Sequence, residues 1–157
     1  MPDLQPDIRN AVRALIIEGG AVLVLEKTDR GRGRRFALPG GAQDVGESLR
    51  DTLQRECLEE IGTRVEIGGL RFCCDYFKRR NTTPPSRRHV VEFVFDCGVP
   101  AGYRPGCGSR PDKHQLGVCW LPLEQLPGLE LIPGYLLDLL PRKAGVNPVY
   151  AGTFHGQ

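Results

Sequence analysis

The segment from Glu47 to Gly62 constrains what this 157-residue chain can fold into more than any other part of the sequence. At the roughly 100° turn per residue of an α-helix, its apolar side chains fall on a single stripe. The stripe consists of Leu49, Leu53, Cys57 and Ile61. Gly62 follows directly, at the position where a left-handed residue commonly ends a helix. The pattern predicts a helix over residues 47–61 that packs against the rest of the protein through this stripe.

Short apolar segments on both sides of this helix predict a β-sheet. We expect strands at residues 12–17, 21–25, 36–38, 64–67, 70–77, 89–96 and 116–121. The first two strands form a hairpin, whereas 79–86 and 98–111 are expected to be loops rich in Pro, Gly and Arg. One helical turn is expected at 122–126 and a closing helix at 133–140. The sequence predicts one α/β domain over residues 1–157, with its core at about 10–140 and helices packed on a sheet.

The overall charge gives little indication of a partner. The formal net charge is +2, which is too small to imply a nucleic acid or a membrane. A small-molecule ligand is favoured, while a nucleic acid is disfavoured without being ruled out. The N-terminus has no signal-peptide pattern, and no apolar run approaches the roughly 18 residues of a membrane span. We therefore expect a cytoplasmic protein, and both a monomer and a homodimer remain open.

The cysteines do not follow the pattern of a metal site. The chain has six of them, but no Cys-x-x-Cys pair, and its three histidines do not complete a zinc spacing. Reduced, partly buried thiols are favoured over a disulfide framework or a zinc site.

The carboxylates of the predicted helix are placed unusually. Glu56, Glu59 and Glu60 converge along the edge of the apolar stripe, where solvated acids are not normally found. An all-oxygen cluster of this kind favours a hard divalent cation, Mg²⁺ first and Mn²⁺ second. Arg55 could hold a carboxylate in orientation beside such ions, and the Gly40-Gly41 turn lets the backbone approach a bound ion. The alternative interpretation is a solvated acidic helix face.

The same stretch resembles the Nudix box, the signature of the Nudix hydrolase family. Gly41, five residues, Glu47, seven residues and then Arg55 to Thr63 follow its spacing, with every glycine, arginine and glutamate position matched. Cys57 and Thr63 depart from the pattern at two hydrophobic positions, which serve packing. The order of the predicted strands around the box also resembles the family layout over most of residues 10–140.

This resemblance implies a fold, a reaction and a set of roles. The fold is an α/β/α sandwich with a mixed sheet, and the reaction is hydrolysis of a nucleoside diphosphate linked to another group. The implied metal ligands are the Gly40 carbonyl and the three glutamates Glu56, Glu59 and Glu60, with Glu47 and Arg55 in support. Glu56 is also assigned provisionally as the general base. Asp112, His114 and Gln115 are the weaker candidates outside the box.

Basic residues gather at 27–35 and 78–88, on either side of the acidic box segment in sequence. This arrangement suits an acidic, metal-loaded floor rimmed by phosphate-binding arginines, although solvated loops are an equal alternative. We expect four residues to bind substrate: Arg35, Tyr76, Arg79 and Arg80.

Three functional interpretations follow. The favoured one is a Mg²⁺-dependent hydrolase that acts on nucleoside diphosphate derivatives and releases a nucleoside monophosphate. The others are a nucleotide-binding regulatory module with the Nudix fold, and an RNA 5′-end pyrophosphohydrolase suggested by the arginine-rich segments. The sequence does not select among nucleotide sugars, ADP-ribose, oxidised nucleoside triphosphates and RNA ends.

Overall fold

A nine-stranded mixed β-sheet forms the centre of the computed structural model, which describes residues 2–29, 31, 33–140 and 148–156. The strands are β1 (Arg9–Glu18), β2 (Ala21–Asp29), β3 (Gly33–Ala37), β4 (Gly40–Ala42), β5 (Glu66–Arg80), β6 (Ser86–Gly98), β7 (Gln115–Pro122), β8 (Leu131–Ile132) and β9 (Tyr150–His155). Their order is β8-β3-β2-β1-β6-β5-β9, with β4 paired to β1 and β7 paired to β2. Three of the pairs, β1–β6, β3–β8 and β5–β9, are parallel and the others antiparallel. The predicted mixed sheet is confirmed.

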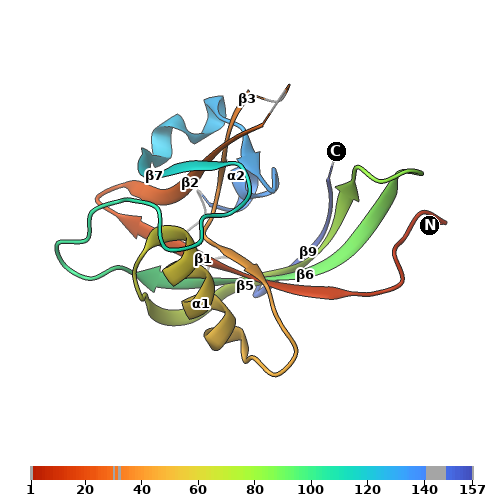
Figure 1. Cartoon of the computed structure of the whole chain (residues 1–157), viewed down its shortest axis with the longest axis horizontal. Coiled ribbons are helices and arrows are strands. Elements are labelled where there is room, and N and C mark those ends of the chain that lie inside the picture. The colour runs from red at the N-terminus through yellow and green to blue at the C-terminus, as the bar shows by residue number, and fades with distance from the viewer. Residues whose placement is uncertain (1, 30, 32, 141–147, 157) are drawn as a thin grey trace.

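Strand β1 joins the two halves of the sheet. Residues 9–16 pair with β6, and the last two residues of β1 pair with β2 across the predicted hairpin turn. Gly19 and Gly20 form that turn with φ values of 56° and 74°, which suit glycine. Figure 1 shows β5, β6 and β9 diverging from β2, β3 and β7 beyond this junction.

Helix α1 (Leu49–Ile61) lies on one face of the sheet, as the apolar stripe predicts. Ser48 caps it by accepting the N–H of Asp51, whose side chain in turn accepts the N–H of Ser48. Gly62 ends it in the left-handed conformation. Leu53, Cys57 and Ile61 are buried in one core with residues of β1 and β2. Full burial of each Leu or Ile contributes about 1.5–3 kcal/mol, which fixes the helix on the sheet.

The opposite face of the sheet carries a second core. There the helix η1 (Leu123–Gly128) and the short helix α2 (Leu136–Leu139) pack over Phe36, Leu38 and Phe72. The arrangement of helix, sheet and helices agrees with the predicted sandwich, although α2 is shorter than the expected helix at 133–140. No helix in the described part of the chain is long and apolar enough to span a membrane.

The basic segments are more ordered than the sequence predicts. The expected loop at 79–86 is reduced to residues 81–85, because β5 and β6 continue as a long hairpin through the pairs Lys78–Arg88 and Arg79–Arg87. The two strands predicted at 64–67 and 70–77 are one strand, β5, with irregular register around Leu70. Strand β9 was not predicted, because its pairing with β5 is a long-range contact that leaves no local pattern.

Candidate active site

A pocket of about 410 Å³ opens beside α1, where β1, β4, the β5–β6 hairpin and residues 110–113 meet. We call it the catalytic pocket, because it holds residues that the sequence predicts to be catalytic. Its lining includes Gly40, Gly41, Glu56, Glu59 and Glu60, so the fold brings together all of the predicted metal ligands. Strand β4 and the C-terminal half of α1 supply them, because β4 pairs with β1 directly beneath the helix.

Glu60 is the most buried of these acids, with 2% of its surface exposed. Its Oε1 atom accepts the backbone N–H of Gly40 at 2.8 Å. Burial nevertheless raises the pKa of Glu60 to about 8, because desolvation disfavours the charged form. A positive charge beside this carboxyl would favour its ionised form.

Arg55 connects the other acids of the box. Its Nη1 donates to Oε1 of Glu56 at 2.9 Å and lies 3.6 Å from Oε2 of Glu59. Its Nε and Nη2 donate to the two carboxylate oxygens of Glu47 at 2.8 and 2.9 Å. One guanidinium therefore fixes two carboxylates by hydrogen bonds through its planar array of donors and lies within ion-pair distance of a third.

The pKa values of two of these acids move in opposite directions. The hydrogen bonds from Arg55 lower the pKa of Glu47 to about 2, with help from the Asp44 amide and the Thr52 hydroxyl. Burial raises the pKa of Glu56 above its ordinary value, although Arg55 opposes the shift. Glu47 is absent from the pocket lining and acts on the pocket through Arg55, whereas Glu56 faces it.

The two glycines of strand β4 are required by close packing. A Cβ on Gly40, whose φ is 145°, would lie 1.9 Å from the backbone oxygen of Val12. A Cβ on Gly41 would lie 2.4 Å from Oε1 of Glu56. At these two positions the backbone fits between β1 and the present position of the Glu56 carboxylate because glycine has no side chain.

The oxygen ligands of the pocket suit a hard divalent cation, but the carboxylates are not arranged in metal-coordination geometry. Within the described ranges, no group of three or more acidic, His or Cys side chains stands in metal-binding geometry. Arg55 instead contacts Glu56 and Glu59. These carboxylates, Glu60 and the backbone of Gly40 all line one pocket and offer only oxygen ligands, which Mg²⁺ and Mn²⁺ prefer.

The remaining wall of the catalytic pocket is cationic. It is lined by Arg9, Arg13, Lys78, Arg80, Arg88, Arg110 and Lys113. Only Arg80 among these was predicted to bind substrate. The strands β1, β5 and β6 bring most of the others here from distant parts of the sequence. A patch of this kind suits the oxygens of a phosphate chain.

A buried carboxylate fixes one of the cations of this wall, Arg13. Glu92, 2% exposed, accepts Nε of Arg13 at 3.3 Å and the Tyr135 hydroxyl at 3.0 Å. Sequence reasoning did not single out Glu92 or Arg13. One signal in the sequence could have identified Glu92: it is the single carboxylate inside the apolar run from Val90 to Phe95. A charge in such a strand requires a partner.

The other predicted substrate residues do not line the catalytic pocket. Arg35 is buried at 8% exposure, Tyr76 is buried in the core, and Arg79 is exposed on the hairpin. All three line a neighbouring hollow of about 1210 Å³, which lies between the β5–β6 hairpin and residues 127–138. Of the first basic segment, Arg30 and Arg32 lie outside the described residues.

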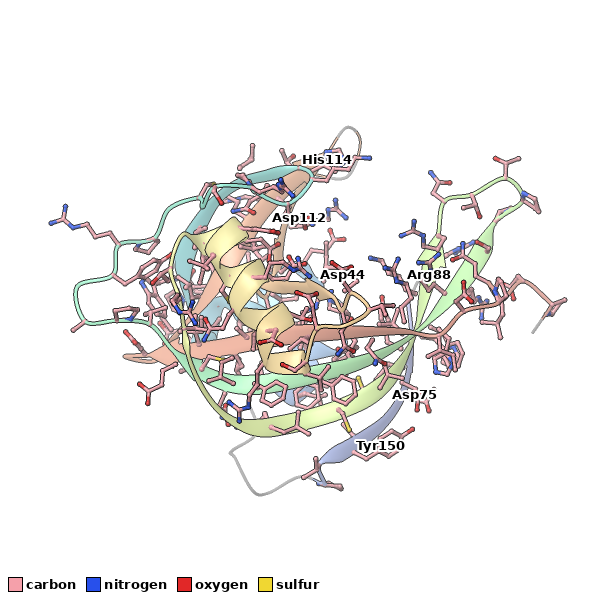
Figure 2. The ribbon with its side chains drawn as sticks, turned by 60° about the horizontal axis from the view of Figure 1, so that its bottom comes forward. Asp44, Asp75, Arg88, Asp112, His114 and Tyr150 are labelled. Carbon is pink, nitrogen blue, oxygen red and sulfur yellow. The ribbon has the colours of Figure 1, made fainter. Side chains whose placement is uncertain are left out.

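Residues 110–113 line the pocket beside the C-terminal end of α1. Figure 2 shows Asp112 and Asp44 near α1, with Arg88 across from them on the hairpin. Asp112 lines the pocket and pairs with Lys27, which lowers its pKa in spite of burial. His114 and Gln115 do not line it. The Gln115 amide instead donates to the backbone oxygen of Glu60 at 2.9 Å and ties this segment to the helix.

Comparison with known proteins agrees with this arrangement. A family model described as the NUDIX domain matches residues 7–140. The chain belongs to the Nudix family. The predicted resemblance is thereby confirmed, and Glu56, Glu59 and Glu60 of the catalytic pocket lie within the stretch that resembles the Nudix box.

Individual relatives share less than a third of their aligned residues with this chain. A MutT-like protein of Streptomyces ambofaciens is 28% identical over 134 residues, which cover 85% of this chain and 75% of that protein. The NAD-capped RNA hydrolase NudC of Pectobacterium atrosepticum is 27% identical, covering 82% of this chain but only 42% of that protein. The crystal structure of a MutT protein from Methanosarcina mazei Go1 matches with a TM-score of 0.62 and 27% identity, covering 86% of this chain and 91% of that one.

Proposed function

We propose that this Nudix protein is a Mg²⁺-dependent hydrolase that cleaves the diphosphate linkage of a nucleoside diphosphate derivative and releases a nucleoside monophosphate. Mn²⁺ would substitute for Mg²⁺. One observation carries the proposal: the three carboxylates Glu56, Glu59 and Glu60 share a pocket with a wall of cations. A diphosphate would be flanked there by both the reactive and the binding groups.

The residues of the Nudix box would have distinct roles in this reaction. Glu56, Glu59, Glu60 and the Gly40 carbonyl would hold the cation, which when bound supplies charge neutralisation and a more acidic water. Arg55, itself anchored by Glu47, keeps the carboxylates in position. The cations of the pocket wall bind the phosphate oxygens and orient the linkage.

Glu56 is the residue we propose as general base. It faces the catalytic pocket, and burial raises its pKa above the ordinary value, which makes the carboxylate a stronger base. Asp112 also faces the pocket, but its pairing with Lys27 lowers its pKa and makes it a weaker base.

A nucleotide panel assayed with Mg²⁺ tests the proposal. The panel contains ADP-ribose, a nucleotide sugar, a nucleoside triphosphate and NAD, and the readout is released mononucleotide. We expect Glu60→Gln to lose at least about 100-fold in kcat, which is the typical cost of one catalytic electrostatic contact. The control is Glu18→Gln, an exposed acid at the end of β1.

Two results would contradict the proposal. Equal activity of Glu60→Gln and the wild type would remove the metal assignment. Tight nucleotide binding without turnover of any panel member would instead favour the regulatory-module alternative. The cytoplasmic location and the homodimer stay predictions.

An RNA 5′ end is the second candidate substrate. The relative NudC is named an NAD-capped RNA hydrolase, and Arg80 and Arg88 of the hairpin line the catalytic pocket. NAD-capped RNA therefore belongs in the panel beside free NAD. Binding of RNA through these arginines requires an affinity that falls steeply with salt.

A further inference from the structure

Arg13 lies in the sheet where three strands of the catalytic pocket meet. Its backbone on β1 pairs with Gly40 of β4 on one side and with Val94 of β6 on the other. The N–H of Gly40 is the group that binds the Glu60 carboxylate. The side chain of Arg13 lines the catalytic pocket together with Glu60. Strand pairing therefore places this arginine directly beside the carboxylate wall.

The guanidinium of Arg13 is held through one of its three nitrogens. Its Nε donates to Oε2 of the buried Glu92 at 3.3 Å. Across the described residues, the two terminal nitrogens of Arg13 form no hydrogen bond with the protein. The side chain keeps 19% of its surface exposed. Glu92 thus sets the direction of the guanidinium and leaves its terminal edge accessible from the pocket.

A second contact fixes Glu92 itself. The Tyr135 hydroxyl, whose residue is 6% exposed, donates to the same Oε2 atom at 3.0 Å. Burial and the charge of Glu92 keep the pKa of Tyr135 far above its ordinary value, so the hydroxyl retains the proton that it donates. Tyr135 belongs to the core on the face of the sheet opposite α1. The orientation of Arg13 is therefore set from that core.

Stability alone does not account for this buried pair. Removing a guanidinium and a carboxylate from water costs free energy that their attraction repays only in part, and apolar residues of similar size often serve a fold equally well. Although burial opposes the charged form, Glu92, Tyr135 and Glu60 raise the pKa of Arg13 above its ordinary value. Arg13 is thus a permanent cation with a fixed direction and an accessible edge, which suits a bound anion.

We propose that Arg13 binds the diphosphate at the linkage to be cleaved, and that Glu92 and Tyr135 are positioning residues that aim its guanidinium. This inference rests on the proposed hydrolase function and assigns a phosphate contact within that site. Two terminal nitrogens can donate to two phosphate oxygens at once, in a planar geometry that an ammonium group does not offer. Because the side chain is oriented before the ligand arrives, binding requires little further ordering of it.

Arg13→Lys separates binding from structural support. A lysine can still pair with Glu92, so we expect Tm to stay within about 3 °C of the wild type. It lacks the planar edge, so kcat/KM should fall at least about tenfold. The matched control is Arg71→Lys, which changes an arginine–carboxylate pair with Asp96 outside the catalytic pocket and should keep kcat/KM within about twofold. Wild-type kcat/KM in Arg13→Lys would overturn the inference.

A double-mutant cycle tests the positioning by Glu92. We expect Glu92→Gln to lower kcat/KM about tenfold in the wild-type background, and less than about threefold once Arg13 is replaced by lysine. Equal factors in both backgrounds would overturn the positioning role. If Glu92→Gln fails to fold, Tyr135→Phe takes its place in the cycle, with an expected loss of about threefold. Tyr150→Phe removes a similar hydroxyl bond to Asp75 and should lose nothing.

A binding measurement separates this inference from the proposed function. Absence of turnover for every nucleotide of the panel would contradict the proposed hydrolase. Calorimetric titration with methylenediphosphonate, a diphosphate analogue whose bridge cannot be hydrolysed, still tests Arg13. With Mg²⁺ present, we expect the wild type to bind it at least about tenfold more tightly than Arg13→Lys. Equal affinities, or no binding by the wild type, would overturn the inference.

Discussion

The two walls of the catalytic pocket differ in how their charges are held. On the α1 side, Glu56 and Glu47 are fixed by Arg55, and Glu60 is fixed by the Gly40 amide. On the hairpin side, Lys78 and Arg80 form no ion pair within the described residues. The carboxylate wall is therefore preorganised, whereas Lys78 and Arg80 of the cationic wall remain available to an anion.

In the proposed hydrolase, this difference would separate catalysis from substrate recognition. Groups that act on a reacting bond are most effective when their orientation is set before the ligand arrives. Cations that bind a flexible phosphate chain can be ordered by the ligand itself. Changes on the α1 side should therefore alter kcat or the fold, and changes on the hairpin side should alter KM. The predictions below test this contrast in order of decreasing effect.

The largest effect is expected at the two glycines of β4. In Gly40→Ala the new Cβ would meet the Val12 backbone oxygen at 1.9 Å, and the backbone cannot yield. We expect a loss of about 4 kcal/mol or more in the free energy of unfolding, measured by urea denaturation.

Gly41→Ala is the matched variant. Its Cβ meets the end of the Glu56 side chain, which can move. We expect this variant to fold but to lose about 100-fold in kcat. A Gly40→Ala protein as stable as the wild type would contradict the packing of β4 against β1.

The second effect concerns the guanidinium of Arg55. In Arg55→Lys the charge is retained, but the bidentate contact with Glu47 and the contact with Glu56 cannot both be made. We expect kcat to fall by roughly 100-fold with a much smaller change in KM. Arg64→Lys, an exposed position beyond the helix, serves as control. Full activity of Arg55→Lys would show that positive charge alone suffices.

The third effect is on the hairpin side. Lys78→Gln removes a cation that lines both the catalytic pocket and the neighbouring hollow. We expect KM to rise about tenfold while kcat stays within about twofold. Steady-state kinetics at two salt concentrations measure this, since added salt should raise the KM of the wild type more than that of the variant. A fall in kcat without a change in KM would indicate that Lys78 acts in catalysis, and would contradict the proposed difference between the two walls.

The smallest effect is a pH dependence of stability at Glu47. Because Arg55 lowers the folded-state pKa of Glu47 to about 2 from 4.5, ionised Glu47 stabilises the fold above pH 4.5. This contribution is lost as the pH falls from 4.5 toward 2. The drop in Tm between pH 6 and pH 3 should be smaller in Glu47→Gln than in the wild type by a few degrees. Thermal melts of Glu18→Gln give the comparison, and identical drops in all three proteins would contradict the assignment.

Local sequence patterns were sufficient to predict helix α1 and the positions of the Nudix-box residues along it. The apolar spacing from Leu49 to Ile61 predicts both the helix and its buried face, and Gly62 marks its end. The strand positions were also largely correct, because alternating or apolar runs are local signals. Strand β9 and the full length of the β5–β6 hairpin were not predicted, since they depend on pairing partners elsewhere in the chain.

The sequence by itself determined the family, the acidic helix and the identity of the residues gathered around the box, because their spacing along one helix already sets their relative positions. Tertiary structure alone decided which cations face them. Arg13 and Lys78 come from β1 and β5, and the buried Glu92 that holds Arg13 comes from β6. Strand pairing placed Arg35 and Tyr76 in the neighbouring hollow and not in the catalytic pocket. The physical reason is that a helix fixes neighbours three and four residues apart, whereas a sheet joins residues whose separation in sequence carries no pattern.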